Sequence, residues 1–183
     1  MTGYQQAILY LGGSYNGNRF VVRNVDRHYV DAVADCFPGC HVYLQHHANP
    51  SKKDYWCIKS AHVAKPALSD VSDFSGFCRG FVELQGGITA YHVNVRGRQR
   101  FVIKLRVFGS EDDLEFISRA LPAAPKKIQH IYTNTGHTCA LIYQSKAEII
   151  DILDYIDGIP QNTAIWDKWW EILNSRLCKE KKV

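Results

Sequence analysis

The predicted fold depends first on residues 79–88, Arg79-Gly80-Phe81-Val82-Glu83-Leu84-Gln85-Gly86-Gly87-Ile88. A weaker copy with the sequence LGGSYNGN stands at residues 11–18, where it parallels Cys78–Gln85. Either stretch alone is weak evidence. The two together are stronger, because each one precedes the same series of predicted elements.

The chain repeats itself downstream of the two stretches. Asp26–Leu68 parallels Ser110–Leu153, and each segment is predicted to run helix, strand, strand, helix. Asp26 and Ser110 are both placed as N-caps of the first helix in their segment. The first copy is shorter between the opening stretch and this helix, by about the length of one hairpin. The first half is therefore expected to lack one hairpin.

Acidic and basic residues are segregated along the chain. Between Glu83 and Glu111 there is no acid, whereas the predicted helices are acidic. Within this interval, Phe101, Ile103, Leu105 and Val107 alternate with mostly cationic neighbours, as in a two-faced strand. Upstream, Tyr91, Val93 and Val95 alternate with His92 and Asn94, and residues 96–99 supply a turn. The pattern predicts a hairpin with one apolar and one cationic face.

The cationic positions of the predicted strands and loops are candidate contacts to nucleic acid, because phosphate and base-edge recognition uses Arg and Lys. An acid-free surface exceeds what solubility requires, since mixed charges would serve that purpose. The candidate residues are Arg96, Arg98, Arg100, Lys104, Arg106, Lys52, Lys53, Lys59, Lys126 and Lys127.

Composition bounds the class of protein. The 183 residues are 46% hydrophobic and 22% charged with a net charge of +4, which excludes a disordered or fibrous chain. No apolar run is long enough to span a membrane, and the N-terminus lacks the pattern of a signal peptide. The six cysteines are expected to be reduced thiols, so we expect an intracellular, reducing compartment, either cytoplasm or an organelle matrix.

The run at residues 79–88 resembles the LAGLIDADG motif of homing endonucleases, and residues 11–18 resemble a degenerate copy. The resemblance covers about residues 4–156. It implies an α+β fold of two αββαββα-type halves that form a saddle over nucleic acid, here with a C-terminal helix added. The corresponding divisions are 1–72, 73–158 and 159–183. The family's motif helices pack through small residues, which would be Gly12, Gly13 and Gly80.

The same resemblance casts doubt on catalysis. The two metal-binding acids of the family fall on Asn18 and Gln85, and both are amides. Magnesium at a phosphodiester needs anionic oxygen ligands, which amides do not supply. Glu83 is a fallback acid, but it lies two residues too early on the helix. No catalytic residue is therefore expected to be intact, and Mg²⁺ is expected as a cofactor only if cleavage persists.

Two further features of the sequence have residue types that are found in functional sites. Cys36, Cys40 and His41, with His46, His47 and Cys57 nearby, have the residue types of a zinc site, but the repeat aligns Cys36–Cys40 with a segment that has no ligands, so no metal is expected. The predicted C-terminal helix, Asn162–Leu173, carries Trp166, Trp169 and Trp170 on one stripe. This stripe is expected to be core, with a protein-binding face as the alternative.

Three functions remain in competition. The first is a cleavage-deficient protein that binds duplex DNA or structured RNA, as a regulator, a maturase or a ribonucleoprotein component. The second is a Mg²⁺-dependent site-specific DNA endonuclease, and the third is a protein-interaction module. The dependence of affinity on salt distinguishes the third function from the first two, because binding to phosphates weakens steeply as ionic strength rises.

Overall fold

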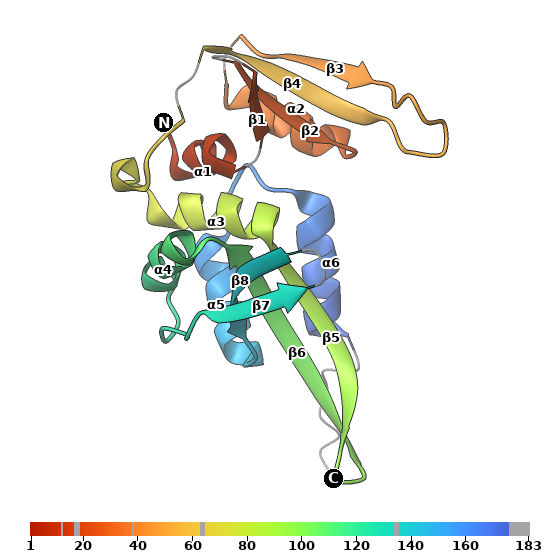
Figure 1. The fold of residues 1–183 in the computed structure, drawn as a ribbon, viewed down its shortest axis with the longest axis vertical. Coiled ribbons are helices and arrows are strands. Elements are labelled where there is room, and N and C mark those ends of the chain that lie inside the picture. Colours follow the sequence, from red (N-terminus) through yellow and green to blue (C-terminus); the bar gives the residue numbers. More distant parts are fainter. Residues whose placement is uncertain (12, 17–18, 38, 63–64, 134–135, 176–183) are drawn as a thin grey trace. The chain divides into compact units, whose positions relative to one another are not determined.

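The structure is a computed structural model that describes residues 1–175 except 12, 17–18, 38, 63–64 and 134–135. The chain forms two compact units (Figure 1). Unit 1 comprises Met1–Leu84 and the later segment Gly158–Ala164, and unit 2 comprises Gln85–Asp157 and the chain from Ile165 onward. None of the helices in the described part of the chain is long and apolar enough to cross a membrane.

Unit 1 contains one antiparallel sheet with the strand order β1-β2-β4-β3. The helix α2 packs against three of its strands and begins at Asp26, whose carboxylate accepts the N–H groups of His28 and Tyr29. The elements are α1 (Gly3–Leu11), β1 (Gly13–Asn16), β2 (Arg19–Asn24), α2 (Arg27–Asp35), β3 (His41–Gln45), β4 (Tyr55–His62), the 3₁₀ turn η1 (Leu68–Asp70) and α3 (Phe74–Gln85).

Unit 2 repeats this arrangement with the strand order β5-β6-β8-β7. Ser110 caps α4 as predicted, by accepting the N–H of Asp113 at 3.2 Å. The elements are β5 (Gly86–Val95), β6 (Arg98–Gly109), α4 (Glu111–Ala120), β7 (Gln129–Thr133), β8 (Gly136–Tyr143), α5 (Lys146–Ile156) and α6 (Thr163–Asn174). The predicted α+β class and the repeated halves are confirmed.

The hairpin expected to be missing from the first half is present but short. β1 pairs with β2 from Gly13↔Val22 to Asn16↔Arg19, whereas β5 and β6 pair over the whole of Gly86–Val95. The prediction was wrong because residues 13–16 had been assigned to the opening motif and so were not available as a strand. The helix α1 ends earlier, at Leu11.

The second helix predicted for the first half is also corrected. Lys65–Ala67 is not helical, and Leu68–Asp70 forms only a single 3₁₀ turn. Pro66 explains this locally, because its ring removes a backbone N–H and disfavours helical backbone at Lys65. The corresponding segment of unit 2 forms the three-turn helix α5.

Each unit has its own apolar core. In unit 1, Tyr4 and Ile8 of α1 join Phe20, Val22 and Ile58 of the sheet, all with 0–1% exposure. In unit 2, α4 packs on β6 and β8, and α5 packs on β6. The fully buried residues there include Leu105, Val107, Leu114, Ile117, Leu141, Ile149 and Ile152. The alternation predicted for β6 is confirmed.

Within unit 1, α1 and α3 pack directly against each other (Figure 1). A Cβ added to Gly80 would lie 2.7 Å from the Cβ of Ala7 and 3.3 Å from the carbonyl oxygen of Tyr4. At Gly3, an added Cβ would overlap the carbonyl oxygen of Asp73. Gly80 was predicted correctly as a contact residue. Its expected partners were not, since Gly13 belongs to β1 and Gly12 lies outside the described residues.

Asp73 joins the start of both helices. Its carboxylate accepts the N–H of Gly76 in α3 at 3.0 Å and the N–H of Gly3 in α1 at 2.9 Å. Although partial burial opposes ionisation, these two N–H groups hold the pKa of Asp73 below its usual value. The negative charge also lies at the positive ends of two helix dipoles. Asp73 therefore stabilises the packing of α1 on α3.

We expect Asp73→Ala to lower the free energy of unfolding by about 1–2 kcal/mol at pH 7, the usual cost of losing an N-cap. Because the pKa of Asp73 is lower in the folded state, its contribution is present above the unfolded value of about 3.9 and is lost as the pH falls through the folded pKa. Urea unfolding at pH 7 and at pH 3 measures the free energy of unfolding of both proteins. The difference in this free energy between the variant and the wild type must be smaller at pH 3 than at pH 7. A difference that widens at low pH would contradict the assignment.

The C-terminal helix α6 matches its prediction closely, and its tryptophans belong to the interior. Trp166 and Trp169 are 2% and 3% exposed, their rings lie 5.9 Å apart, and Trp170 is half-buried. A protein-binding face made of Trp166, Trp169 and Trp170 is therefore wrong, because a partner cannot reach two of the three side chains.

Candidate nucleic-acid interface

The hairpin β5–β6 presents a cationic face. Directly paired residues of antiparallel strands share a face, so the pairs Val95↔Arg98, Val93↔Arg100 and Thr89↔Lys104 lie on one side of the ribbon. Gly87↔Arg106 continues the same side. The opposite side carries the core residues Ile88, Ile103 and Leu105. Arg100, Lys104 and Arg106 therefore line one face, as predicted, and Arg98, which was predicted to lie in the turn, joins them as the first residue of β6.

The register corrects one part of the prediction. Tyr91 pairs with Val102, so Tyr91, Val93 and Val95 lie on the cationic face and not on the apolar one. The alternation of Tyr91, Val93 and Val95 misled because it was assigned to a face from β5 alone, whereas the pairing with β6 sets the face. The turn has two residues, Arg96 and Gly97, with φ of 51° and 77°. Such a left-handed pair is the favoured connection of a twisted two-stranded ribbon. It places Arg96 at the tip of the hairpin.

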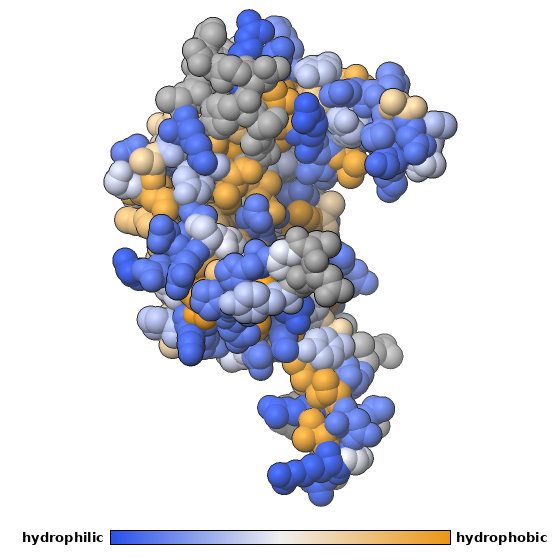
Figure 2. Space-filling model, in the orientation of Figure 1, coloured by the Kyte–Doolittle hydropathy of each residue, from blue (hydrophilic) through white to orange (hydrophobic). Residues whose placement is uncertain are grey.

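An aromatic ring interrupts the cationic face. The Nζ of Lys104 lies 5.6 Å from the ring centroid of Tyr91, and Tyr91 is 38% exposed. A ring held among cations can stack on a base or sugar. Figure 1 shows the hairpin projecting beyond β7 and β8, and Figure 2 shows hydrophilic and apolar side chains interleaved along it. The ribbon is thus open to a long ligand.

The sheet of unit 1 has a smaller face of the same kind. The pairs Arg23↔Cys57, Cys57↔Tyr43 and His41↔Lys59 share the side opposite Val22 and Ile58, which are core. Arg23, His41, Tyr43 and Lys59 are all exposed. The prediction included Lys59 but missed Arg23, because Phe20, Val21 and Val22 are all buried and β2 shows no clear alternation.

The remaining predicted lysines differ in availability. Lys52, Lys53 and Lys127 are exposed and lie outside the strands. Lys126 is half-buried, and its Nζ lies 2.6 Å from Oε1 of Glu148 and over the ring of Tyr143. Its charge is therefore already balanced within unit 2.

The described strands carry basic but no acidic residues. None of the described strands, β1–β8, contains Asp or Glu. They carry seven cations: Arg19, Arg23, Lys59, Arg98, Arg100, Lys104 and Arg106. A sheet of this composition favours polyanions and has no carboxylate to repel them.

Glu83 is committed to the interior of unit 1. It is 5% exposed, and its Oε2 accepts the phenolic O–H of Tyr4 at 2.7 Å while its Oε1 accepts the backbone N–H of Asn162 at 3.1 Å. Burial raises the pKa of Tyr4, and the neighbouring Tyr29 and Glu83 raise it further, so Tyr4 remains a donor. Glu83 thus joins three segments of chain and is a poor candidate for a metal ligand.

Arg79 is a second buried charge on α3. Its guanidinium lies 4.9 Å from the ring centroid of Tyr4, and its Nη2 donates to the carbonyl oxygen of Ile159 at 3.4 Å. Like Glu83, it ties α3 to α1 and to the segment Gly158–Ala164. These two charges hold the unit together and do not face a ligand.

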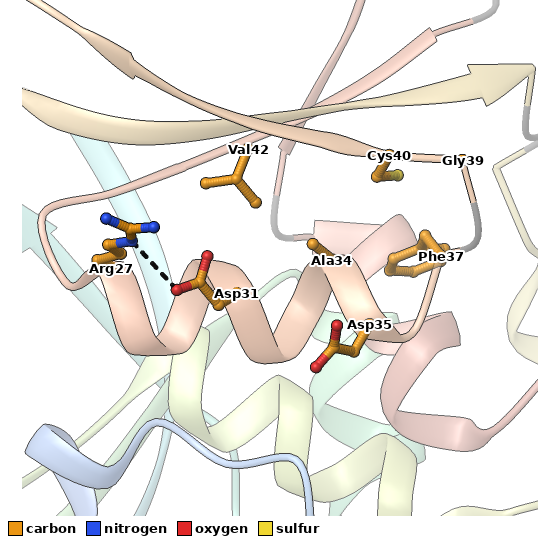
Figure 3. A pocket seen from close by; sticks show the side chains of 8 residues that line it. All are labelled: Arg27, Asp31, Ala34, Asp35, Phe37, Gly39, Cys40 and Val42. Carbon is orange, nitrogen blue, oxygen red and sulfur yellow. Dashed lines mark hydrogen bonds and ion pairs between the residues drawn. The ribbon is translucent and has the colours of Figure 1, made fainter.

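A shallow depression of about 690 Å³ lies between α2 and β3 (Figure 3). Asp31 and Asp35 contribute carboxylates to it, and Arg27 contacts Asp31 through Nε at 3.3 Å. Two acids make it unsuitable for a phosphate backbone. The depression is therefore separate in character from the cationic faces.

The cysteines and histidines of unit 1 do not converge. Cys40 lines the depression, the Sγ of Cys36 donates to the carbonyl oxygen of Ala32, and Nδ1 of His46 lies 2.8 Å from Asp54. Burial raises the pKa of both Cys36 and Cys40, which disfavours the thiolates that zinc needs. In the part of unit 1 that the structure describes, these side chains form no group of three donors.

Solved structures of similar fold are found, although no protein-family model matches the sequence and no curated protein is significantly similar to it. Full-length DUF199/WhiA from Thermatoga maritima aligns with a TM-score of 0.59 at 17% identity, over 99% of this chain and 61% of that chain. The I-LtrWI LAGLIDADG homing endonuclease bound to target DNA aligns with a TM-score of 0.61 at 11% identity, over 97% of this chain and 91% of that chain. I-SmaMI bound to an uncleaved DNA target with calcium aligns with a TM-score of 0.64 at 9% identity, over 94% of this chain and 90% of that chain. The chain has a LAGLIDADG-like fold.

The LAGLIDADG-like fold fixes the register of the two motifs. Ala7 lies against Gly80, α1 ends at Leu11, and β1 begins at Gly13 as β5 begins at Gly86. The first motif therefore corresponds to residues 7–13 and not to 11–18. Asn18 lies outside the described residues, but strands stand on either side of it, so the motif helix ends before it.

This register changes one predicted metal-ligand position of the LAGLIDADG-like motifs. Gln85, the last residue of α3, keeps its assignment, whereas its counterpart in the first motif is Gly12. Glycine has no side chain, and an amide oxygen carries no charge, so neither residue fits a magnesium ion at a phosphodiester. The residues present do not fit the metals that the fold family implies.

Proposed function

We propose that the chain binds duplex DNA through the cationic faces of its two sheets, chiefly through β5–β6, and does not cleave it. The observation that carries the proposal is that the described strands contain seven cations and no acid. Exposed cations in such an array bind phosphates and release counterions.

Duplex DNA suits the ribbon better than duplex RNA. The major groove of B-form DNA admits a two-stranded β-ribbon, whereas the deep, narrow major groove of A-form RNA does not. The ten paired residues of β5 extend roughly 30 Å at about 3.3 Å per residue, close to one turn of DNA. The short hairpin β1–β2 keeps a second four-stranded sheet in the molecule, which removes the main reason to prefer RNA. I-LtrWI and I-SmaMI were solved with DNA, in support.

The absence of cleavage is inferred from the two motif ends. The resemblance placed the family's acids on Asn18 and Gln85, and the corrected register replaces Asn18 by Gly12. Glu83 is bound to Tyr4 and Asn162. These positions therefore supply no carboxylate pair to balance two divalent ions.

Binding is tested with a labelled 30-base-pair duplex, a single strand and a structured RNA at several salt concentrations. We expect the duplex to bind most tightly, with a dissociation constant that rises steeply with salt. A preference for the RNA would point to a maturase or ribonucleoprotein component instead. Affinity that does not change with salt would contradict recognition of phosphates altogether.

We expect the wild-type protein, with Mg²⁺ or Mn²⁺, to shift a library of duplexes in a gel while leaving them uncut. The physical reason is the missing anionic ligands at Gly12 and Gln85. Denaturing electrophoresis of the recovered DNA measures it, and a commercial restriction enzyme in the same buffer serves as the positive control. Metal-dependent cutting that disappears in Gln85→Ala would overturn the prediction.

A further inference from the structure

The hairpin β7–β8 in unit 2 carries three metal-ligating side chains on one face. His130 pairs directly with Cys139 across the two strands, and His137 lies two residues before Cys139 on the same strand. Paired residues and residues two apart share a face of a sheet. The backbone register alone thus brings one thiol and two imidazoles together.

The donor atoms of these side chains converge. Nδ1 of His130 lies 3.1 Å from Nε2 of His137, and Sγ of Cys139 lies 3.4 Å from the first nitrogen and 3.9 Å from the second. A tetrahedral zinc ion with bonds of about 2.05 Å to nitrogen and about 2.3 Å to sulfur separates two nitrogens by roughly 3.4 Å and nitrogen from sulfur by roughly 3.6 Å. Each observed distance is within a few tenths of an ångström of these values.

Neighbouring rings hold the ligands in place. The two imidazoles are stacked at 5.3 Å with an interplanar angle of 13°, and the ring of Tyr132 lies 4.8 Å from that of His137. Cys139 is 5% exposed, whereas both histidines are exposed. The site is therefore anchored on a buried sulfur and remains open to an ion from solvent.

We propose that His130, His137 and Cys139 form a binding site for Zn²⁺, with solvent in the fourth position. The mixed nitrogen and sulfur donors suit zinc and not Mg²⁺ or Ca²⁺, which take oxygen ligands. Binding releases the thiol proton of Cys139 to solvent and leaves a thiolate on the metal. The ion replaces the hydrogen bonds that join the three side chains without it.

The site joins the edge of the sheet to its interior. In the order β5-β6-β8-β7, β7 is an edge strand held only by β8 among the described strands. A metal bound across the pair would therefore resist fraying of β7. This inference is independent of the DNA-binding proposal.

Zinc binding is tested by titrating chelator-treated protein with Zn²⁺ against a chromophoric chelator, and with Co²⁺ as a spectroscopic probe. We expect one ion per chain, a thiolate-to-cobalt charge-transfer band, and a higher midpoint of thermal unfolding with zinc. Cys139→Ser should abolish the charge-transfer band, and His130→Gln should weaken zinc binding at least tenfold. Because His130 is exposed, His130→Gln should leave the fold intact, so weaker zinc binding in this variant would not be due to misfolding. Circular dichroism checks that the variant is folded.

Cys40→Ser is the matched control, a thiol outside the cluster, and should bind zinc as the wild type does. Unchanged zinc affinity in both His130→Gln and Cys139→Ser would overturn the proposal. So would loss of binding in Cys40→Ser with retention in Cys139→Ser, because the metal would then belong to the cysteines of unit 1.

Discussion

A protein carrying Arg98→Gln, Arg100→Gln, Lys104→Gln and Arg106→Gln is expected to bind duplex DNA about 10³-fold more weakly than wild type at 0.1 M salt. The four cations lie on one face of β5–β6 with no acid in the same strands. Removing each phosphate contact should also lower the slope of log affinity against log salt by about 0.9. Glutamine keeps much of the aliphatic stem, although Lys104→Gln removes the ammonium group that lies over Tyr91. Fluorescence anisotropy at four salt concentrations measures both effects.

The matched control removes cations that already have partners. Arg27 contacts Asp31, and Arg119 contacts Glu115, each four residues along a helix. Arg27→Gln with Arg119→Gln changes net charge by two but touches neither cationic face, so affinity should change by less than about tenfold. The loss of affinity per cation removed is compared between the two variants. If it is as large in the control as in the hairpin variant, net charge and not the face of β5–β6 explains the affinity.

Gly80→Val is expected to lower the free energy of unfolding by about 3 kcal/mol, because the added carbons have no room between α1 and α3. A Cβ at this position already lies 2.7 Å from that of Ala7, in a core of close-packed side chains. Valine adds two further carbons and prefers a helix less than most residues do. Urea unfolding followed by tryptophan fluorescence measures the loss.

Two companion variants separate crowding from a general effect of substituting glycine. Gly87→Ala adds a Cβ that meets nothing within 4 Å, so its stability should stay within about 0.5 kcal/mol of wild type. Ala7→Gly should be partly compensating in the Gly80→Ala background, with a coupling of about 1–2 kcal/mol. Additive effects of Ala7→Gly and Gly80→Ala would show that the two residues do not share this contact.

The sequence correctly predicted the elements that have a sustained hydrophobic period or a capping residue at one end. The caps Asp26 and Ser110, the alternation of β6 and the tryptophan helix α6 all appear where expected. Each depends on local rules, either a cap or a single hydrophobic period. The cationic face of β6 belongs to the same class, because it needs only the alternation within one strand.

The errors concern relations between segments. The motif at residues 11–18 was displaced because LGGSYNGN also contains small residues, and only the contact between Ala7 and Gly80 fixes the register. Tyr91 was assigned to the wrong face because the apolar alternation was followed within β5 alone, whereas the pairing across the ribbon decides which face it shares. The cluster at His130 was missed for the same reason, since His130 and Cys139 are nine residues apart in sequence but paired across β7 and β8.

The segment Gly158–Ala164 has a consequence for biosynthesis. It supplies the N–H of Asn162 to Glu83 and the carbonyl oxygen of Ile159 to Arg79, both within unit 1. During translation, all of Gln85–Asp157 must be made before these groups exist. Until then the first unit of the nascent chain holds a buried carboxylate and a buried guanidinium that have not yet made these two hydrogen bonds. A ribosome-bound chain stopped before residue 158 should therefore hold unit 1 less stably than the longer chain does, because the segment that completes these two contacts is still missing.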